Sequence, residues 1–478
     1  MRTEEQLGES NIVAADVAKP RRGMPAPRNE ARELAIHELF FSTTDRKGII
    51  RSGNRVFVRV SAYSRAELVG SPHNVIRHPD MPRAVFQLLW DEIEAGRPIA
   101  AYVKNLAKDG RYYWVMATVV PIEDGYLSVR LKPSTPFFDA AQAIYPQLLA
   151  LEKEVEGGEP RRRKEAIAAS TARLLDLLRD AGFPSYEAFM HAALAAEVKS
   201  RDALIGSSVH RRLATAPVGA DPALVEILAA CVAISDYFDG LVTKLDDYVA
   251  LNQKLEKKAS YVLDLADDVR LFSLNALLAS TRVGGAGAPL GAIAGIMGAR
   301  CDASDPVFQE LTSEITAARE LLGDMLFRVA ATKIQAEIAT VFVNDLLQLG
   351  DDARTAATDV SALARCLADG IDGLVASLTG FESRTEALGR HVVDLKADLG
   401  VLRALEVNGR IEAARASLAE AVVALFTSIG EQIAAARREL DDLSHVGLLS
   451  LGEDATEAKR IRNHVEEILD HVAPLRAA

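Results

Sequence analysis

The chain has 478 residues, of which 49% are hydrophobic and 26% charged, and its formal net charge is -12. The length predicts two to four domains, and the acidic balance argues against a nucleic-acid partner. No apolar stretch approaches the ~20 residues of a membrane-spanning helix, and the charged N-terminus lacks the apolar region of a signal peptide. Three widely spaced cysteines, Cys231, Cys301 and Cys366, form neither a disulfide framework nor a metal pair. We therefore expect a cytoplasmic protein without a metal centre.

The first 33 residues are polar, contain Pro20, Pro25 and Pro27, and are predicted to form a flexible tail. Residues 34–134 then show short runs of aromatic and β-branched residues separated by turn signals. We expect one α+β domain here, with a five-stranded antiparallel sheet and short helices. The expected strands are 39–44, 49–52, 99–106, 112–122 and 126–131, and the expected helices are 54–61 and 81–95.

From Pro136 onward the strand signals disappear, and Ala, Leu, Glu, Lys and Arg dominate. This pattern predicts a helical connector over residues 135–216 and a helical bundle or coiled coil over residues 217–478, because long amphipathic helices bury their apolar faces against one another. The fold class is therefore multidomain, α+β followed by all-α. Helix breaks are predicted near Pro217, residues 284–289, residues 302–306, residues 350–352 and Gly370.

The centre of the α+β domain carries a specific motif, Arg77-His78-Pro79-Asp80-Met81-Pro82. Together with Ser42-Thr43-Thr44-Asp45, Val103-Lys104-Asn105 and Tyr113-Trp114-Val115, it resembles the PAS domain of aerotaxis receptors, which bind FAD without covalent attachment. The resemblance runs over residues 42–130, with Ile99 standing where the family often has tryptophan. It implies a PAS fold over residues 34–134 and a flavin in its interior.

The resemblance places six residues at this flavin. Arg77, His78 and Asp80 match positions at the cofactor, and Asn54, Trp90 and Asn105 match positions that line or support the pocket. The residue types suit these roles, because arginine pairs with a pyrophosphate in a fork geometry, asparagine bonds the edge of a flavin ring, and tryptophan supplies a flat apolar wall. Without the resemblance, we would interpret Asp80 as the N-terminal cap of the following helix and Trp90 as a residue of the hydrophobic core.

Other readings of this domain stay open. A haem needs an axial ligand, for which His37, His73 and His78 are available. Alternatively, an empty PAS fold serves only for dimerisation in a scaffold protein whose bundle is structural. A light sensor that bonds cysteine to flavin is not expected, because residues 34–134 contain no cysteine. An enzyme is not expected either, because the sequence has no nucleophile–base pair, metal cluster or nucleotide-binding loop.

Two helical segments resemble the hairpin tip of methyl-accepting chemotaxis proteins. In residues 272–285 the pattern is matched at five positions, and Ala279 replaces the family's glutamate. In residues 405–416 it is matched at six positions, and no Gly-rich turn follows. The first set is Leu274, Asn275, Ala276, Arg282 and Gly284, and the second is Asn408, Ile411, Glu412, Ala413, Ala414 and Arg415. The resemblance implies a chemotaxis histidine kinase with its coupling protein as partner, contacted through Asn275, Arg282, Asn408, Glu412 and Arg415.

Two related helical segments in one chain suggest an internal repeat. A chemoreceptor dimer forms a four-helix bundle from two hairpins, so one chain with two hairpins would build a comparable bundle by itself. The sequence thus predicts a cytoplasmic redox or oxygen sensor, which we expect to be a homodimer. A change in the flavin would alter packing against residues 137–155, and the helices would carry that change to a chemotaxis-type partner.

Overall fold

The computed structural model describes residues 25–206, 220–282, 288–349, 353–415, 420–444 and 451–477. The chain divides into two compact units. The first combines residues 1–235, 333–367 and 467–478, and the second combines residues 236–332 and 368–466. The first unit therefore joins the N-terminal domain and the connector to parts of the long helices, whereas the boundaries expected at residues 134 and 216 stay a prediction.

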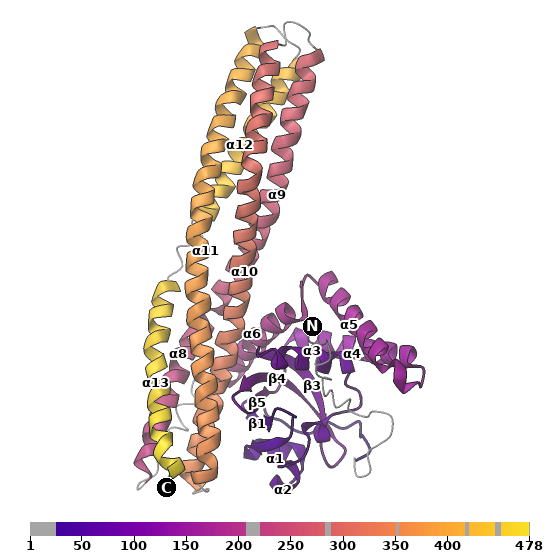
Figure 1. Ribbon diagram of the computed structural model, residues 1–478, viewed down its shortest axis with the longest axis vertical. Helices are drawn as coiled ribbons and strands as arrows, with labels where there is room; N and C mark the ends of the chain where they lie inside the picture. Colours follow the sequence, from indigo (N-terminus) through magenta and orange to yellow (C-terminus); the bar gives the residue numbers. More distant parts are fainter. Residues whose placement is uncertain are drawn as a thin grey trace, which may run out of the picture. The chain divides into compact units, whose positions relative to one another are not determined.

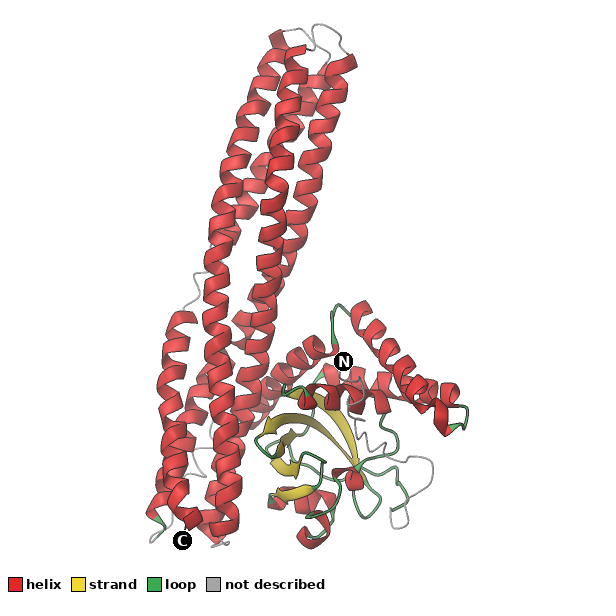
Figure 2. Cartoon of the chain, in the orientation of Figure 1, coloured by secondary structure: helices red, strands yellow, loops and turns green. Residues whose placement is uncertain are grey.

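The first unit contains the expected five-stranded antiparallel sheet (Figures 1 and 2). Its strands lie in the order β2-β1-β5-β4-β3. Asp109-Gly110 lies in the connection between β3 and β4, where this dipeptide favours a tight hairpin, and Asp124-Gly125 leads from the β4–β5 turn into β5. The bounds are β1 (Leu39–Asp45), β2 (Ile50–Gly53), β3 (Ile99–Leu106), β4 (Tyr112–Ile122) and β5 (Gly125–Leu131).

Successive side chains of a strand point to opposite faces of the sheet. The strand register defines an inner face, which carries Phe40, Ser42, Asn105, Tyr113, Ser128 and Arg130. It also defines an outer face, which carries Phe41, Thr43, Tyr102 and Trp114. All residues of β5 are buried, so both faces are covered by other elements.

Short helices cover the inner face. They are α1 (Arg55–Ser61), α2 (Arg65–Leu68), η1 (His73–Ile76) and α3 (Arg83–Glu94). Asn54 caps α1 by accepting a hydrogen bond from the Phe57 amide at 3.2 Å, and Ser64 with Glu67 forms a capping box at the start of α2. The Phe57 ring stacks on Phe40 of the sheet, with ring centroids 5.7 Å apart.

The connector helices cover part of the outer face. They are α4 (Pro136–Glu156), η2 (Pro160–Arg162), α5 (Arg163–Asp180) and α6 (Tyr186–Ile205). The Tyr102 hydroxyl donates to Glu197 of α6 at 2.8 Å, and the Tyr145 hydroxyl of α4 donates to the Tyr102 carbonyl at 3.0 Å. The expected packing of the domain against residues 137–155 is therefore present.

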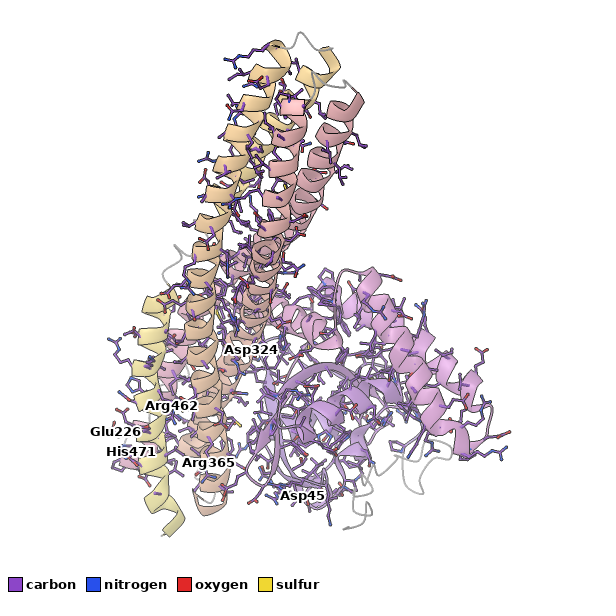
Figure 3. All side chains as sticks on the ribbon, turned by 45° about the horizontal axis from the view of Figure 1, so that its top comes forward. Asp45, Glu226, Asp324, Arg365, Arg462 and His471 are labelled. Atoms are coloured by element: carbon purple, nitrogen blue, oxygen red, sulfur yellow. The ribbon has the colours of Figure 1, made fainter. Side chains whose placement is uncertain are left out.

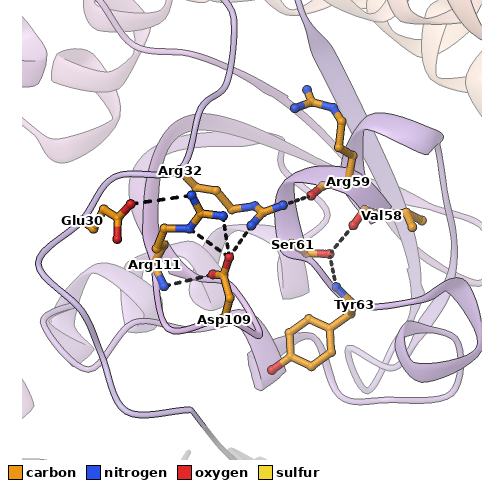
Figure 4. Close-up of polar contacts among 8 residues, drawn as sticks. All are labelled: Glu30, Arg32, Val58, Arg59, Ser61, Tyr63, Asp109 and Arg111. Atoms are coloured by element: carbon orange, nitrogen blue, oxygen red, sulfur yellow. Dashed lines mark hydrogen bonds and ion pairs between the residues drawn. The ribbon is translucent and has the colours of Figure 1, made fainter.

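Residues 28–32, which the sequence assigns to the tail, run beside the start of β4. The Arg28 amide donates to the Gly110 carbonyl and the Arg32 amide to the Tyr112 carbonyl, each at 2.7 Å. The Arg32 guanidinium pairs with Asp109 and donates to the Arg59 carbonyl at 2.7 Å (Figure 4). Backbone pairing and a shared carboxylate thus fix a segment whose composition carries no strand signal.

The second unit is an antiparallel bundle of long helices (Figure 1). It contains α9 (Leu245–Arg282), α12 (Glu420–Ser444) and the parts of α10 (Ala288–Leu349) and α11 (Ala353–Arg415) that lie outside residues 333–367. The remaining helices, α8 (Pro222–Thr243) and α13 (Leu451–Ala477), each have residues in both units. Polar contacts join each of α9, α10, α11 and α12 to the next: Arg319 to Asn252 at 3.2 Å, Ser304 to Asp398 at 2.6 Å, Lys396 to Asp441 at 2.5 Å and Lys258 to Asp442 at 3.3 Å. The ring closes, so two hairpins of one chain form a four-helix bundle.

None of the described helices combines the length and the apolar content needed to cross a lipid bilayer.

Two of the predicted helix breaks are wrong, because α10 runs through Pro306 and α11 runs through Gly370. Proline removes one backbone hydrogen bond from a helix. Phe308 and Leu311 directly beyond Pro306 are buried, and their burial outweighs that loss. The breaks expected at Pro217, residues 284–287 and residues 350–352 lie outside the described residues.

Gly370 serves close packing between two helices. A Cβ atom at Gly370 would lie 2.3 Å from Thr332 Oγ1 of α10. Thr332 is itself buried, so its side chain has little room to move. The glycine therefore marks a close approach of α10 and α11 and not a helix end.

We predict that Gly370→Ala lowers the free energy of unfolding by ~1–3 kcal/mol, because the new methyl group must displace a buried threonine. Gly389→Ala in the same helix is the matched control, since no atom lies within 4 Å of its Cβ position. At position 389, alanine should raise the free energy of unfolding by ~0.5–1 kcal/mol, because its helix propensity is higher than that of glycine. Urea denaturation followed by circular dichroism measures both effects, and effects of the same sign would contradict the packing account.

Candidate cofactor site

Buried polar atoms without a partner gather at the inner face of the sheet. Arg77 Nε, Asn105 Nδ2 and the hydroxyls of Tyr113 and Ser128 make no hydrogen bond to the described residues. Three of these residues project from β3, β4 and β5, and Arg77 is joined to Asn105 by a backbone bridge. Buried polar groups are normally hydrogen-bonded. Because all four atoms can donate, they fit a ligand rich in acceptor atoms, as the ring edge and the phosphates of FAD are.

The Arg77 guanidinium keeps one buried donor, Nε, without a hydrogen-bond partner among the described residues. The guanidinium lies 4.0 Å above the Phe86 ring, and Nη2 donates to the Met81 carbonyl at 3.2 Å. Burial lowers the pKa of Arg77 to about 10, and the Glu152 carboxylate opposes this shift. The side chain is therefore still a cation at neutral pH, with an aromatic face and one carbonyl as its contacts.

His78 and Asp80 lie beside Arg77 in different environments. His78 is buried, and its Nδ1 accepts a hydrogen bond from the Asp80 amide at 3.1 Å, which places the proton of the neutral ring on Nε2. Burial, helped by the Lys104 cation, lowers the pKa of His78 to about 4. Asp80 is exposed, and although burial opposes its ionisation, the Lys104 ammonium at 2.6 Å holds its pKa below the ordinary value.

Asp80 does not cap the helix that follows. Helix α3 begins at Arg83, and the Glu152 carboxylate of α4 accepts hydrogen bonds from the amides of Arg83 and Ala84 at 3.1 and 3.0 Å. Glu152 is fully buried and also accepts from Ser170 of α5 at 2.8 Å. A negative charge at a helix N-terminus is stabilised by the helix dipole. The loop Arg77–Pro82 is therefore anchored to the connector helices through the start of α3.

The structure does not bring all six predicted residues together. Arg77, His78, Asp80 and Asn105 form one cluster at the end of β3. All polar atoms of the Asn54 side chain bond to protein: Oδ1 to the Phe57 and Phe41 amides, and Nδ2 to the Leu39 carbonyl. Asn54 therefore supports the domain by tying α1 to β1.

Trp90 lies at the opposite end of the sheet. Its ring contacts Tyr126 edge-on, with ring centroids 5.6 Å apart. Tyr126 pairs with Pro121 of β4, whereas Asn105 pairs with Tyr113. Tyr113 and Pro121, eight residues apart on β4, are ~27 Å apart at the usual rise of ~3.4 Å per residue. Trp90 and Asn105 therefore line different ends of the domain interior.

The sequence reasoning missed a second polar cluster on the inner face. Arg130 is buried, and its guanidinium bonds to Ser42 Oγ at 2.9 Å and to His73 Nε2 at 2.8 Å. Burial and the Arg130 charge lower the pKa of His73 to about 3, so its ring is neutral. The available signal was an arginine within a strand that is otherwise suited to burial, because charged residues are rarely buried without a partner.

The two tip-like segments end α9 and α11, which lie diagonally across the bundle because each of them contacts α10 and α12. The first ends α9, where Asn275 is exposed, and the side chain of Arg282 lies outside the described part of the chain. The second ends α11, where Asn408 is exposed and Arg415 lies 3.0 Å from Glu412. Figure 1 places both ends at the same end of the bundle, as the two-hairpin hypothesis requires.

Comparison with known proteins identifies the N-terminal domain. Residues 51–128 match the family model described as PAS fold. The chain is 40% identical over 122 residues to the aerotaxis receptor of Escherichia coli, over 24% of each chain. It is 27% identical over 82 residues to the biofilm dispersion protein BdlA of Pseudomonas aeruginosa, over 17% of this chain and 20% of that protein.

The chain spans a quarter or less of the length of either curated relative. A solved PAS domain from Colwellia psychrerythraea is also similar, at 24% identity over 20% of this chain and 85% of that chain, with a TM-score of 0.18. Residues 34–134 thus contain a PAS domain of the type that the motif Arg77–Pro82 indicates, followed by the long helices described above.

Proposed function

We propose that this chain, with a PAS domain similar to that of an aerotaxis receptor, is a cytoplasmic redox or oxygen sensor that binds FAD without covalent attachment. The observation that carries the proposal is the set of unpaired buried donors at the inner face, Arg77 Nε, Asn105 Nδ2, Tyr113 OH and Ser128 Oγ. FAD supplies reversible electron transfer and, with it, a change of charge and hydrogen bonding inside the domain. The chain's own groups only bind and orient it, and we propose no substrate turnover.

Each residue of the Arg77 cluster has a distinct proposed role. Arg77 pairs with a phosphate oxygen through the donors that are still available to it. Asn105 donates from Nδ2 to an acceptor of the ring edge. His78 stays neutral at pH 7 and fixes the loop through the Asp80 amide.

A haem is the second candidate, and the structure gives its three histidines other surroundings. His37 is exposed, and His78 Nδ1 is bonded to the Asp80 amide. His73 Nε2 faces the Arg130 guanidinium at 2.8 Å, a position at which bound iron would meet a cation. These environments favour FAD over haem.

We predict that the purified protein is yellow, with flavin absorbance that bleaches on reduction, and that Arg77→Ala combined with His78→Ala loses the chromophore while keeping its circular dichroism. The physical reason is the loss of the phosphate partner and of the loop anchor. Arg46→Ala combined with His37→Ala is the matched control, since His37 is exposed and Arg46 bonds only to the Glu123 carbonyl among the described contacts.

The outcomes separate the candidates. Full retention of flavin by the Arg77/His78 variant would contradict the proposed site. A haem-type absorbance that disappears with His37→Ala or His73→Ala would replace FAD by haem. A colourless protein that still dimerises through residues 34–134 would favour the scaffold reading.

The outer face gives this sensor a direct route to the long helices. The Phe41 ring meets Phe342 of α10 edge-on, with centroids 5.1 Å apart. Ser52 of β2 donates to the Asp359 carboxylate of α11 at 2.6 Å. Strand β1 also carries Ser42 on its inner face, where Arg130 binds it. A shift of β1 by the cofactor would therefore reach residues 333–367, where α10 ends and α11 begins.

Charged contacts strengthen this junction. Arg201 of α6 and Glu337 of α10 are both fully buried, 2.5 Å apart, and Arg201 also donates to the carbonyls of Ile36 and His37. Removing one partner of such a pair typically costs ~3–5 kcal/mol. Arg365, labelled on its helix in Figure 3, lies on α11 at the surface. It pairs with Glu123 of the β4–β5 turn. These contacts tie the PAS domain to residues 333–367, so a displacement of the sheet would move those helical residues with it.

We predict that reduction with dithionite changes amide hydrogen exchange in residues 353–367, and that Ser52→Ala reduces this change at least twofold while flavin stays bound. The substitution removes the only described hydrogen bond of the Asp359 side chain to the sheet. Thr118→Val is the matched control, because it removes a buried hydroxyl bond within the sheet, from Thr118 to the Val129 carbonyl at 3.0 Å. A Ser52→Ala protein with an unaltered exchange difference would contradict this route.

The tip-like ends of α9 and α11 are the proposed surface for a chemotaxis histidine kinase and its coupling protein. Around Asn275, the leucines Leu271, Leu274 and Leu278 are exposed. Apolar side chains gathered on a surface mark interaction sites. We also propose homodimerisation, which sedimentation velocity tests; the four-helix bundle itself closes within one chain, so a dimer would form through other surfaces.

We predict that Leu274→Glu lowers capture of a purified coupling protein at least tenfold, because it places a charge at the centre of the apolar surface, while the melting temperature stays within 2 °C of wild type, the range of a surface substitution in a domain of this size. Val393→Glu on α11 is the control, since Val393 is also an exposed apolar residue but lies far along the helix from Arg415. Equal capture by wild type and the Leu274 variant would exclude this surface.

A further inference from the structure

Arg130 is a buried cation whose hydrogen-bond partners are neutral. Its side chain is 4% exposed, and its guanidinium bonds to Ser42 Oγ and His73 Nε2. No carboxylate of the described residues pairs with it. The rings of Phe40 and Phe57 lie 5.4 and 5.9 Å from it and compensate only part of the charge.

An uncompensated charge in a protein interior costs several kcal/mol, so its retention calls for a reason. His73 cannot supply a counter-charge, because it accepts the hydrogen bond from Arg130 Nη2 through a neutral ring. Ser42 contributes only a hydroxyl oxygen. The positive charge of Arg130 is therefore unbalanced inside the domain.

Unpaired hydroxyls lie next to this charge. Ser128 precedes Arg130 by two residues on the same face of β5, so their side chains project side by side. The Tyr113 ring meets Phe40 edge-on at 6.3 Å, and Phe40 also borders Arg130. Ser128 is 6% and Tyr113 2% exposed, and neither hydroxyl has a partner among the described residues. The charge and the two unpaired hydroxyls thus lie on the same face of the sheet, around Phe40.

We propose that Arg130, with the hydroxyls of Ser128 and Tyr113, binds the edge of the isoalloxazine ring that becomes negative on reduction, and so sets the redox potential of the sensor. This inference rests on the proposed binding of FAD. The Arg77 cluster then holds the cofactor in both redox states, and the Arg130 cluster distinguishes between them.

The charge balance of the reduction explains the selectivity. When FAD accepts two electrons from a reductant such as dithionite and one proton at N5, the ring carries one negative charge shared by N1 and the C2 carbonyl oxygen. A fixed cation beside this edge stabilises the reduced form more than the oxidised form. Hydroxyl donors add hydrogen bonds that strengthen as the oxygen gains charge.

The test measures the midpoint potential of full-length protein with bound FAD, by stepwise dithionite titration against a reference dye. In Arg130→Met we expect the affinity for reduced relative to oxidised FAD to fall at least tenfold, which corresponds to a midpoint at least ~30 mV more negative for a two-electron couple. Arg130→Lys keeps the charge and should fall between this variant and wild type. Arg97→Met is the control, because it removes the same charge from the surface.

Tyr113→Phe tests the site without removing a charge. Since the Tyr113 hydroxyl has no protein partner, its removal should leave the melting temperature of the FAD-free protein unchanged or raise it, while FAD binds at least fivefold more weakly. Tyr145→Phe is the opposite case, because its hydroxyl donates to the Tyr102 carbonyl. That variant should lower the melting temperature and leave FAD affinity unchanged.

The outcomes distinguish this inference from the function on which it rests. If wild-type protein takes up no FAD, both the proposed sensor function and the proposed role of Arg130 are wrong. If wild type binds FAD but Arg130→Met and Tyr113→Phe leave midpoint and affinity unchanged, the sensor proposal stands and the Arg130 site is excluded. If Arg130→Met does not fold, the Tyr113→Phe affinity decides alone.

Discussion

The alternation of side chains along strand β1 is the constraint on which the rest of the first unit depends. Because neighbouring residues of a strand face opposite ways, Ser42 meets Arg130 in the interior while Phe41 and Thr43 face the long helices. A slip of one residue would exchange these sets. The Asn54 side chain opposes such a slip, because it bonds to the backbone of both Phe41 and Leu39. One strand thereby fixes both the buried polar cluster around Arg130 and the contacts with α10 and α11.

Much of the fold was predictable because local chemistry and tertiary structure agree. The runs of aromatic and β-branched residues and the turn residues between them are short-range signals, and all five expected strands are present close to their expected bounds. The helix breaks predicted at Pro306 and Gly370 are wrong because a helix in a bundle is stabilised more by packing against its neighbours than by its own helix propensity. A local rule cannot register that Thr332, 38 residues earlier, lies against Gly370.

The candidate site likewise contains residues that the sequence predicted and residues that it did not. The motif Arg77–Pro82 is contiguous in sequence, and its residues do lie together with Asn105. Arg130, Ser42 and His73 come from three separate elements, so only the strand register brings them into contact. Glu152 was equally hidden, since it caps a helix that begins 69 residues before it. No local sequence pattern predicts such long-range polar contacts. They determine which buried donor groups remain without a hydrogen-bond partner.

The ring of contacts among α9, α10, α11 and α12 has a consequence for symmetry. In a bundle made by two identical chains, both hairpin ends are copies of one another and must evolve together. Here the two hairpins are covalently linked, so each end is free to diverge: Ala279 stands at the first where Glu412 stands at the second. The two hairpin ends of this chain are therefore distinguishable in sequence, which the two ends of a symmetric dimer of hairpins can never be.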